Sequence, residues 1–194
     1  MSILKHRHFV IHKPYGFLSQ FVYNVTTRKN RKLLGELYEF PDGIMAIGRL
    51  DQDSEGLMFL TTDGKESFNV RSGAVEKEYY VQLDGLISPE GISKLKNGIE
   101  ISTDKGKYMT KPCNAFVIDP QPIFPERSKR VRDDRHGPTQ WVSITISEGK
   151  FRQVRKMTAA SGFPTLRLIR VRIGDVWLDD LTSGGVREVE QFDY

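Results

Sequence analysis

Short segments rich in β-branched and aromatic residues recur along the whole chain, and they outnumber the segments with helical spacing. Alternation is clearest in EKEYYVQLDG, where Tyr79, Val81 and Leu83 fall on one face of a half-buried strand. Because these segments do not alternate regularly with helices, they argue against a parallel sheet with crossover helices. We therefore predict an α+β fold with a mainly antiparallel sheet. The strand-like segments are 9–14, 43–49, 56–62, 76–85, 114–120, 139–149 and 165–178.

Two segments have the signals of helices. In SPEGISKLKNG, Ser88 is a suitable N-cap, Pro89 suits the first turn, and Gly98 marks the end. The second segment, KFRQVRKMTAASG, has two faces at helical spacing. Its predicted core face is Phe151, Val154, Met157 and Thr158, and its predicted basic face is Arg152, Arg155, Lys156 and Ala159.

Basic residues are concentrated in two places, RKNRK at 28–32 and RSKRVRDDRH at 127–136. The second lies in the stretch 120–138, which is rich in proline and charge and too long for an ordinary turn. Such a stretch is typical of a binding loop or a mobile loop. The net charge of +4 and the pI of about 9.1 favour a polyanionic partner.

Cys113 is the only cysteine, which excludes a disulfide framework and a cysteine-based zinc site. We expect it to be a buried structural thiol. The sequence has no long apolar stretch of the kind found in signal peptides or membrane spans. We therefore expect a cytoplasmic protein without a membrane partner.

The segment GRLDQDSEGLMFLTTDG, residues 48–64, places Asp51, Asp53 and Glu55 within five positions. Carboxylates this close repel one another, so a fold seldom selects them for stability alone. The start of the segment resembles a calcium-binding EF-hand loop. However, Thr62 occupies the position of the bidentate glutamate, and the flanking segments are strand-like.

Other site types are equally unsupported. His6, His8 and His12 have the spacing of one strand face rather than of a metal site, and we predict no bound metal. A glycosidase-like pair of Asp51 and Asp53 has no other support. The chain has no G-x-S-x-G elbow and no Walker phosphate loop. The remaining interpretation is one carboxylate acting alone within an RNA-binding surface.

Residues 48–64 resemble the signature of pseudouridine synthases of the RsuA-like ribosomal group, in which the aspartate after Gly-Arg-Leu is catalytic. That residue is Asp51. KPYG (13–16) resembles the first motif of this family, KEYYV (77–81) its Lys-x-Tyr motif, and EGKFRQVRKM (148–157) its third motif. The resemblance runs from about residue 8 to 191. The segment from Pro138 to Asp175 is very similar to the branch that modifies one uridine in large-subunit ribosomal RNA.

This resemblance implies two closely joined lobes with the active-site cleft between them. Most relatives carry an N-terminal S4 RNA-binding domain, whereas this chain starts almost at the catalytic domain. We therefore expect one catalytic domain over residues 1–194, which recognises RNA through its own basic surfaces. The sequence departs from most relatives at Lys156, where they have arginine, and branch-level variation occurs at Lys150 and Phe151.

The family reaction breaks the N1–C1′ bond of a uridine, turns the uracil and rejoins it through C5. Nothing is oxidised and no group enters or leaves, so no cofactor is expected. A carboxylate can serve by attacking C1′ or C6, or by removing the C2′ proton. These three routes stay open at this stage.

The resemblance also implies roles for individual residues. Arg155 pairs with Asp51 and keeps it ionised, and Tyr79 stacks on the extruded uracil. Arg49 follows the phosphate or helps to displace the target base, and Asp53 and Glu55 support the loop. The further residues expected to contact RNA are Lys13, Lys77, Lys150, Arg152 and Gln153.

The expected partner is large-subunit ribosomal RNA or its precursor particle. We expect a monomer with no obligate protein partner. One alternative is a pseudouridine synthase that acts on small-subunit ribosomal RNA or transfer RNA. Another is a non-catalytic ribosome-assembly factor, and the presence of Asp51, Tyr79 and Arg155 argues against it.

Overall fold

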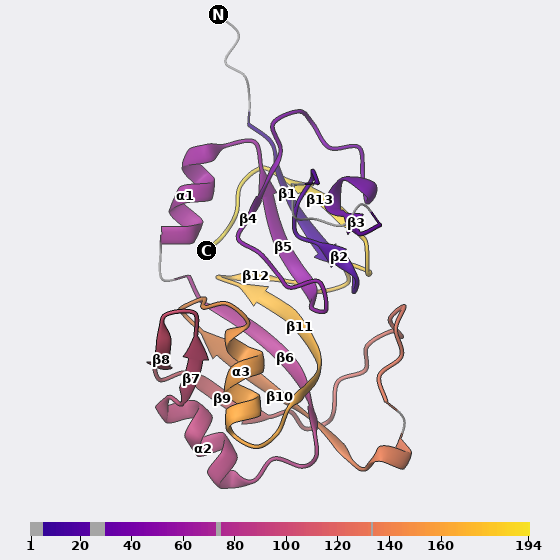
Figure 1. Ribbon diagram of the computed structural model, residues 1–194. Coiled ribbons are helices and arrows are strands. Elements are labelled where there is room, and N and C mark those ends of the chain that lie inside the picture. Colours follow the sequence, from indigo (N-terminus) through magenta and orange to yellow (C-terminus); the bar gives the residue numbers. More distant parts are fainter. Residues whose placement is uncertain (1–5, 24–29, 73–74, 133) are drawn as a thin grey trace, which may run out of the picture. The chain divides into compact units, whose positions relative to one another are not determined.

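The computed structural model describes residues 6–23, 30–72, 75–132 and 134–194, and the chain divides into two compact units (Figure 1). Unit 1 comprises the chain up to Val75 together with Arg170–Tyr194, and unit 2 comprises Glu76–Ile169. The predicted α+β class with mainly antiparallel pairing is confirmed. Arg28 and Lys29 of the first basic segment lie outside the described residues.

Unit 1 is built on antiparallel strands in the order β13–β1–β5, and β4 also pairs with β5. The last residues of β11 belong to this unit and pair with β12. A short parallel pair, β2 with β3, precedes the 3-10 turn η1. The elements are β1 (His8–Lys13), β2 (Phe17–Leu18), β3 (Lys32–Leu33), η1 (Leu34–Glu36), β4 (Met45–Ile47), β5 (Glu55–Thr61), α1 (Gly64–Ser72), β11 (Thr165–Ile173), β12 (Val176–Trp177) and β13 (Val186–Val189).

Strand β5 is buried along its whole length because both faces of the unit 1 sheet are covered. On one face, the ring of Phe9 packs against Tyr38 and Phe40. On the other face, Phe59 stacks on Phe192 of the C-terminal segment at a centroid distance of 4.2 Å. This two-sided burial explains why β5 is a continuous apolar run rather than an alternating one.

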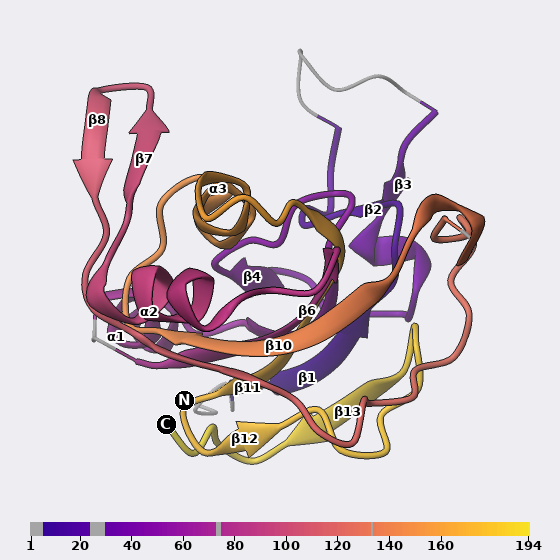
Figure 2. The same cartoon turned by 90° about the horizontal axis from the view of Figure 1, so that it is seen from below.

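Unit 2 has an antiparallel sheet in the order β6–β10–β9, with β7 and β8 forming a separate hairpin. Figure 2 shows α2 and α3 on one side of β10. The elements are β6 (Lys77–Asp84), α2 (Pro89–Asn97), β7 (Glu100–Thr103), β8 (Gly106–Met109), β9 (Asn114–Val117), η2 (Asp134–His136), β10 (Thr139–Ile146) and α3 (Gln153–Ala160). The first residues of β11 also belong to unit 2.

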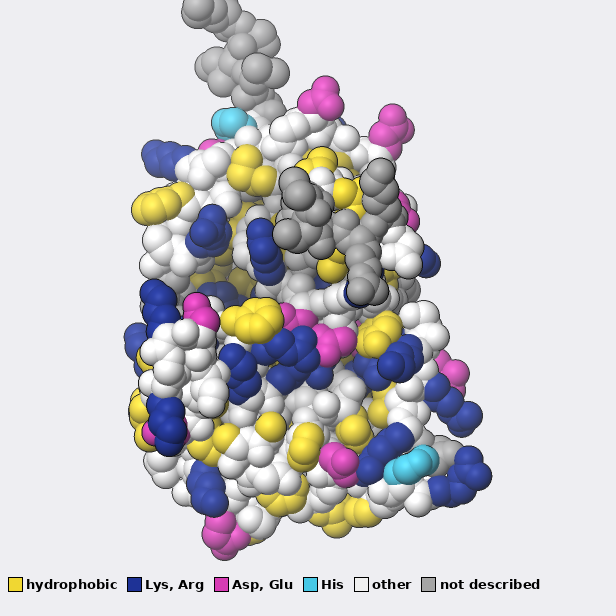
Figure 3. Space-filling view, viewed as in Figure 1, with side chains coloured by type: hydrophobic (Ala, Val, Ile, Leu, Met, Phe, Trp, Pro, Cys, Tyr) yellow, Lys and Arg dark blue, Asp and Glu magenta, His cyan; other side chains and the backbone are white. Residues whose placement is uncertain are grey.

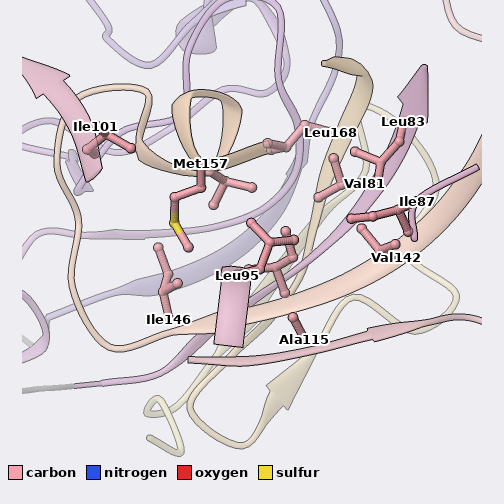
Figure 4. Packing of buried hydrophobic residues seen from close by; sticks show 12 residues of the cluster. Val81, Leu83, Ile87, Leu95, Ile101, Ala115, Val142, Ile146, Met157 and Leu168 are labelled. Carbon is pink, nitrogen blue, oxygen red and sulfur yellow. The ribbon is translucent and has the colours of Figure 1, made fainter. Parts of the chain in front are cut away.

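The core of unit 2 lies between this sheet and its two helices. Met157 of α3 and Leu95 of α2 point into one cluster together with Ile146 of β10 (Figure 4). Every second residue of β6 and β10 points from the sheet into this cluster, as the alternation in the β6 sequence predicted. Its buried members are Val81, Leu83, Ile87, Leu95, Ile101, Ala115, Val142, Ile144, Ile146, Val154, Met157 and Leu168.

The long loop before β10 covers the opposite face of the unit 2 sheet (Figure 2). The ring of Phe124 packs against Tyr80 and Trp141, at centroid distances of 6.2 and 5.3 Å. The side chain of Gln121 accepts a hydrogen bond from Trp141 N at 2.7 Å, and Arg132 forms an ion pair with Asp84. In this structure the loop is therefore anchored to the sheet.

The helix over Pro89–Asn97 is confirmed, with the Ser88 side chain accepting a hydrogen bond from Gly91 N. The second helix is shorter than predicted and begins at Gln153, because Arg152 has the left-handed conformation (φ 54, ψ 33). Phe151 consequently lies before the helix and is exposed, so its assignment to the core face was wrong.

Helix α1 was not predicted from the sequence. The carboxylate of Asp63 accepts a hydrogen bond from Lys65 N at 2.8 Å, as an N-cap residue does. This cap was the available signal. The helix buries only Ser67 and Val70, so its sequence carries almost no apolar periodicity.

Gly56→Ala tests the close approach of β5 to Arg170. Gly56 has a φ of +110, and an added Cβ would lie 2.3 Å from the carbonyl oxygen of Arg170. We expect the free energy of unfolding to fall by about 3 kcal/mol or more. The control Gly64→Ala, at the exposed start of α1, should raise it by about 0.5 kcal/mol. Urea unfolding measures both, and similar values for the two variants would contradict this account.

Candidate active site

Asp51 lies at the first position of a tight turn, in which Ser54 N donates to the Asp51 carbonyl oxygen at 3.1 Å. The neighbours of Asp51 on both sides are tied to an earlier part of the chain. Leu50 exchanges two hydrogen bonds with the Ser19 hydroxyl, at 2.7 and 3.0 Å. Gln52 exchanges two with the backbone of Gly16, at 2.8 and 3.0 Å. The backbone of Asp51 is thus fixed before any substrate binds.

Lys13, from the KPYG segment, has an exposed fraction of 0%. Its ammonium donates hydrogen bonds to the carbonyl oxygens of Pro14 (3.0 Å) and Phe17 (2.7 Å). The burial of Lys13 gives no support to its predicted contact with RNA, which stays a prediction. Lys13 stabilises the turn that carries Gly16, the partner of Gln52.

Burial lowers the pKa of the Lys13 ammonium to about 7. The carboxylates of Glu55, Asp53 and Asp51 act in the opposite direction through their negative charge, and Glu55 has the largest effect of the three. Arg170 lowers the pKa of Lys13 further. The acidic cluster therefore compensates a buried cation in part, which favours a structural role for Asp53 and for Glu55, itself only 2% exposed.

Arg49 is exposed and follows Gly48, which has a φ of +73. The positive φ favours glycine and turns the chain between β4 and the Asp51 turn. An exposed guanidinium two residues before Asp51 agrees with a phosphate contact, which stays a prediction.

Tyr79 and Lys77 lie on β6 in unit 2. Tyr79 is opposite Ile144 of β10, and its half-buried ring packs against the unit 2 cluster. Lys77 is opposite Ile146 and is half-buried. The stacking role of Tyr79 and the RNA contact of Lys77 both stay predictions.

The turn before α3 is organised by Glu148, which sequence reasoning missed. Its carboxylate accepts hydrogen bonds from the Tyr108 hydroxyl (2.6 Å), Lys111 N (3.0 Å) and the Gln153 side chain (2.6 Å). These donors hold the pKa of Glu148 below its ordinary value despite desolvation. The only sequence signal for this role was the position of Glu148 in the third motif, five residues before Gln153.

The predicted RNA contact of Gln153 stays a prediction, and the position of its side chain gives it no support. Gln153 is 3% exposed, and its amide is used within the protein. The amide nitrogen donates to Glu148, and the amide oxygen accepts from Lys150 N at 2.9 Å. Lys150 itself is exposed and Arg152 is half-buried, so their predicted RNA contacts remain open.

Arg155 is half-buried on α3, whose neighbouring residues Val154 and Met157 anchor the helix in the unit 2 core. Asp51 belongs to unit 1, whereas Arg155 and Tyr79 belong to unit 2. The pairing of Arg155 with Asp51 therefore stays a prediction.

Among residues 6–23, 30–72, 75–132 and 134–194, no group of three or more histidine, cysteine or acidic side chains could hold a metal ion. The helices within the same residues are too short or too polar to cross a membrane.

The sequence model of the RNA pseudouridylate synthase family matches residues 7–160, which include the Asp51 turn, Tyr79 and Arg155. The chain belongs to this family. Ribosomal large subunit pseudouridine synthase E from Vibrio parahaemolyticus is 43% identical over 183 residues, spanning 93% of this chain and 73% of the relative. The protein of the same description from Xanthomonas axonopodis pv. citri is 39% identical, spanning 89% of this chain and 88% of the relative.

The fold agrees with this membership. A crystal structure of a pseudouridylate synthase superposes on this chain with a TM-score of 0.76 and 28% identity, covering 97% of this chain and 72% of the other. The predicted family, its fold and its enzyme class are thereby confirmed. The chain is an RNA pseudouridine synthase.

Lys13→Met tests the buried ammonium through the pH dependence of stability. Above pH 7, the folded protein holds Lys13 largely neutral, whereas the unfolded chain keeps it protonated up to its ordinary pKa of 10.5. The unfolded state then binds more protons, so the free energy of unfolding rises with pH. Between pH 7 and 10, the free energy of unfolding of the wild type should rise by about 1 kcal/mol per pH unit relative to that of the variant.

Chemical denaturation at a series of pH values measures this difference. Lys65→Met, at an exposed position of α1, is the control and should change the pH profile little. Parallel profiles for the wild type and the Lys13 variant would show that Lys13 titrates normally in the folded state.

Proposed function

We propose that this enzyme converts one uridine of large-subunit ribosomal RNA to pseudouridine, with Asp51 as the catalytic carboxylate. The observation that carries this proposal is the Asp51 turn, in which Leu50 and Gln52 are both tied to the Ser19 and Gly16 region. Such a turn presents a half-buried aspartate from a fixed backbone position. The large-subunit substrate is supported by the two relatives described above, whose names state it.

The reaction is an isomerisation. The N1–C1′ bond of the uridine breaks, a C5–C1′ bond forms, and the C5 proton is lost while N1 gains one. A carboxylate at Asp51 can add to C1′ or C6, or remove the C2′ proton and later return it to C2′. No external electron or group is required, so we propose that the enzyme uses neither cofactor nor metal.

Asp51 must be ionised in all three routes. A flipped base excludes water from the carboxylate, and desolvation raises its pKa. Two cations oppose this effect in the proposal. The first is Lys13, which carries its charge at and below about pH 7 and whose pKa responds to the Asp51 charge within unit 1. The second is Arg155, whose guanidinium suits a bidentate contact with a carboxylate.

The remaining roles concern RNA. Tyr79 stacks on the extruded uracil, and Arg49, Lys77, Lys150 and Arg152 bind phosphates. Arg49 and Lys150 are exposed, which supports this role most directly. Because RNA binding of this kind releases counterions, affinity should depend on salt.

We further propose that residues 1–194 act as one catalytic domain, as a monomer, in the cytoplasm and without an obligate protein partner. The basic composition supports a direct interaction with RNA. Action on small-subunit ribosomal RNA or transfer RNA is the competing proposal. Mapping pseudouridine across all three RNA classes from cells with and without the gene decides between them, and unchanged maps would favour a non-catalytic assembly factor.

Asp51→Asn should lower single-turnover pseudouridine formation by about 10⁴-fold or more, because the amide is a poor nucleophile and a poor base. RNA binding should hold or improve slightly, since one negative charge is removed. The matched control Asp53→Asn has the same chemical change two residues away and should act mainly through stability. If Asp53→Asn were inactive and Asp51→Asn remained active, the catalytic carboxylate would be misassigned.

Arg155→Ala should lower turnover by about 10²-fold or more, because the charge that keeps Asp51 ionised is lost. Arg155→Lys should recover only part of the activity, since lysine lacks the planar bidentate geometry. Turnover is measured at saturating RNA with stability checked in parallel. Full activity of the lysine variant would indicate that charge alone suffices.

A further inference from the structure

Phe151 is a large aromatic side chain that the fold leaves 73% exposed, in the segment that leads directly into the helix of Arg155. Arg152 adopts the left-handed conformation between Phe151 and α3, and this turns Phe151 away from the apolar face that continues in Val154 and Met157. A left-handed conformation is unfavourable for arginine. A single exposed hydrophobic residue is common, so its surroundings decide whether it has a function.

The surroundings of Phe151 are cationic and aromatic. The ammonium of Lys156 lies 5.3 Å from the centroid of the Phe151 ring. The ammonium of Lys150 lies 4.6 Å from the centroid of Tyr108, whose hydroxyl bonds Glu148. Figure 3 shows Lys and Arg side chains gathered over α3, with hydrophobic side chains exposed among them. Proteins hold unpaired RNA with this combination, in which rings stack on bases and cations contact phosphates.

The backbone on both sides of Phe151 is rigid. Lys150 N donates to the Gln153 side chain at 2.9 Å, and Gln153 N donates to the Lys150 carbonyl oxygen at 3.1 Å. Lys156 N donates to the Arg152 carbonyl oxygen at 3.0 Å. Because this backbone is already ordered, it loses little conformational freedom on binding, which favours recognition.

We propose that Phe151 is a stacking platform for an unpaired nucleobase of the RNA substrate, with Lys150 and Lys156 contacting the adjacent phosphates. This inference rests on the proposed function for the class of substrate and adds a residue that recognises RNA outside the reacting uridine. The occupant is a base of single-stranded RNA, because a base within a duplex has no free face for Phe151.

Two RNA oligomers of about 12 nucleotides test the stacking without knowledge of the target site. One is oligouridylate, and the other has the same ribose-phosphate backbone with abasic positions throughout. Phe151→Ala should weaken binding of oligouridylate about tenfold, and Phe151→Tyr should restore it. The control Phe68→Ala removes an equally exposed ring (68%) on α1 and should change nothing. The wild type and these three variants should all bind the abasic oligomer equally.

Unchanged binding of oligouridylate by Phe151→Ala would overturn the proposal, and so would an equal loss on both oligomers. Thermal unfolding of each variant confirms that the fold is intact. A second measurement uses the ribosomal RNA fragment that carries the mapped uridine, on which kcat/KM of Phe151→Ala should also fall about tenfold. Unchanged kcat/KM would overturn the role in substrate recognition.

This design separates the two proposals. If the wild type forms no pseudouridine in any ribosomal RNA, the proposed function fails, while the oligomer comparison still decides whether Phe151 stacks on bases. If the wild type is active and Phe151→Ala matches it in both measurements, only the stacking proposal fails.

Discussion

The buried ammonium of Lys13 is the interaction on which the candidate site depends. It lies at the end of β1, donates to the Pro14 and Phe17 carbonyl oxygens, and has the carboxylates of Asp51, Asp53 and Glu55 as its electrostatic partners. A cation in this position is unfavourable without compensation. The three carboxylates supply part of that compensation, although desolvation still lowers the pKa of Lys13 to about 7.

The buried Lys13 helps to position Asp51, the proposed catalytic residue of unit 1. The turn that Lys13 stabilises carries Gly16, which holds Gln52, and Gln52 is the residue next to Asp51. The backbone position of Asp51, the proposed catalytic residue, is thus set by hydrogen bonds of both its neighbours to the Gly16 and Ser19 region. Pre-organisation of this kind suits the proposed reaction, because the carboxylate must stay in place while the uracil turns.

Unit 2 achieves comparable rigidity by different means. Near the start of α3, the Glu148 carboxylate accepts hydrogen bonds from the Tyr108 hydroxyl, Lys111 N and the Gln153 amide. The apolar side of the helix is anchored by Val154 and Met157 in the core. Polar hydrogen bonds therefore fix the beginning of the helix and packing fixes its rotation, and both constrain Arg155 and Phe151.

The sequence by itself determined the fold class, most strands and the helix at Pro89–Asn97, because alternation and capping are local signals. It also singled out Asp51, since a carboxylate after Gly-Arg-Leu is a specific motif. Only the tertiary structure decided that the side chains of Lys13 and Gln153 are buried, because burial depends on what folds over a residue. The same holds for Phe151: helical spacing placed it in the core, and one left-handed residue, Arg152, placed it on the surface.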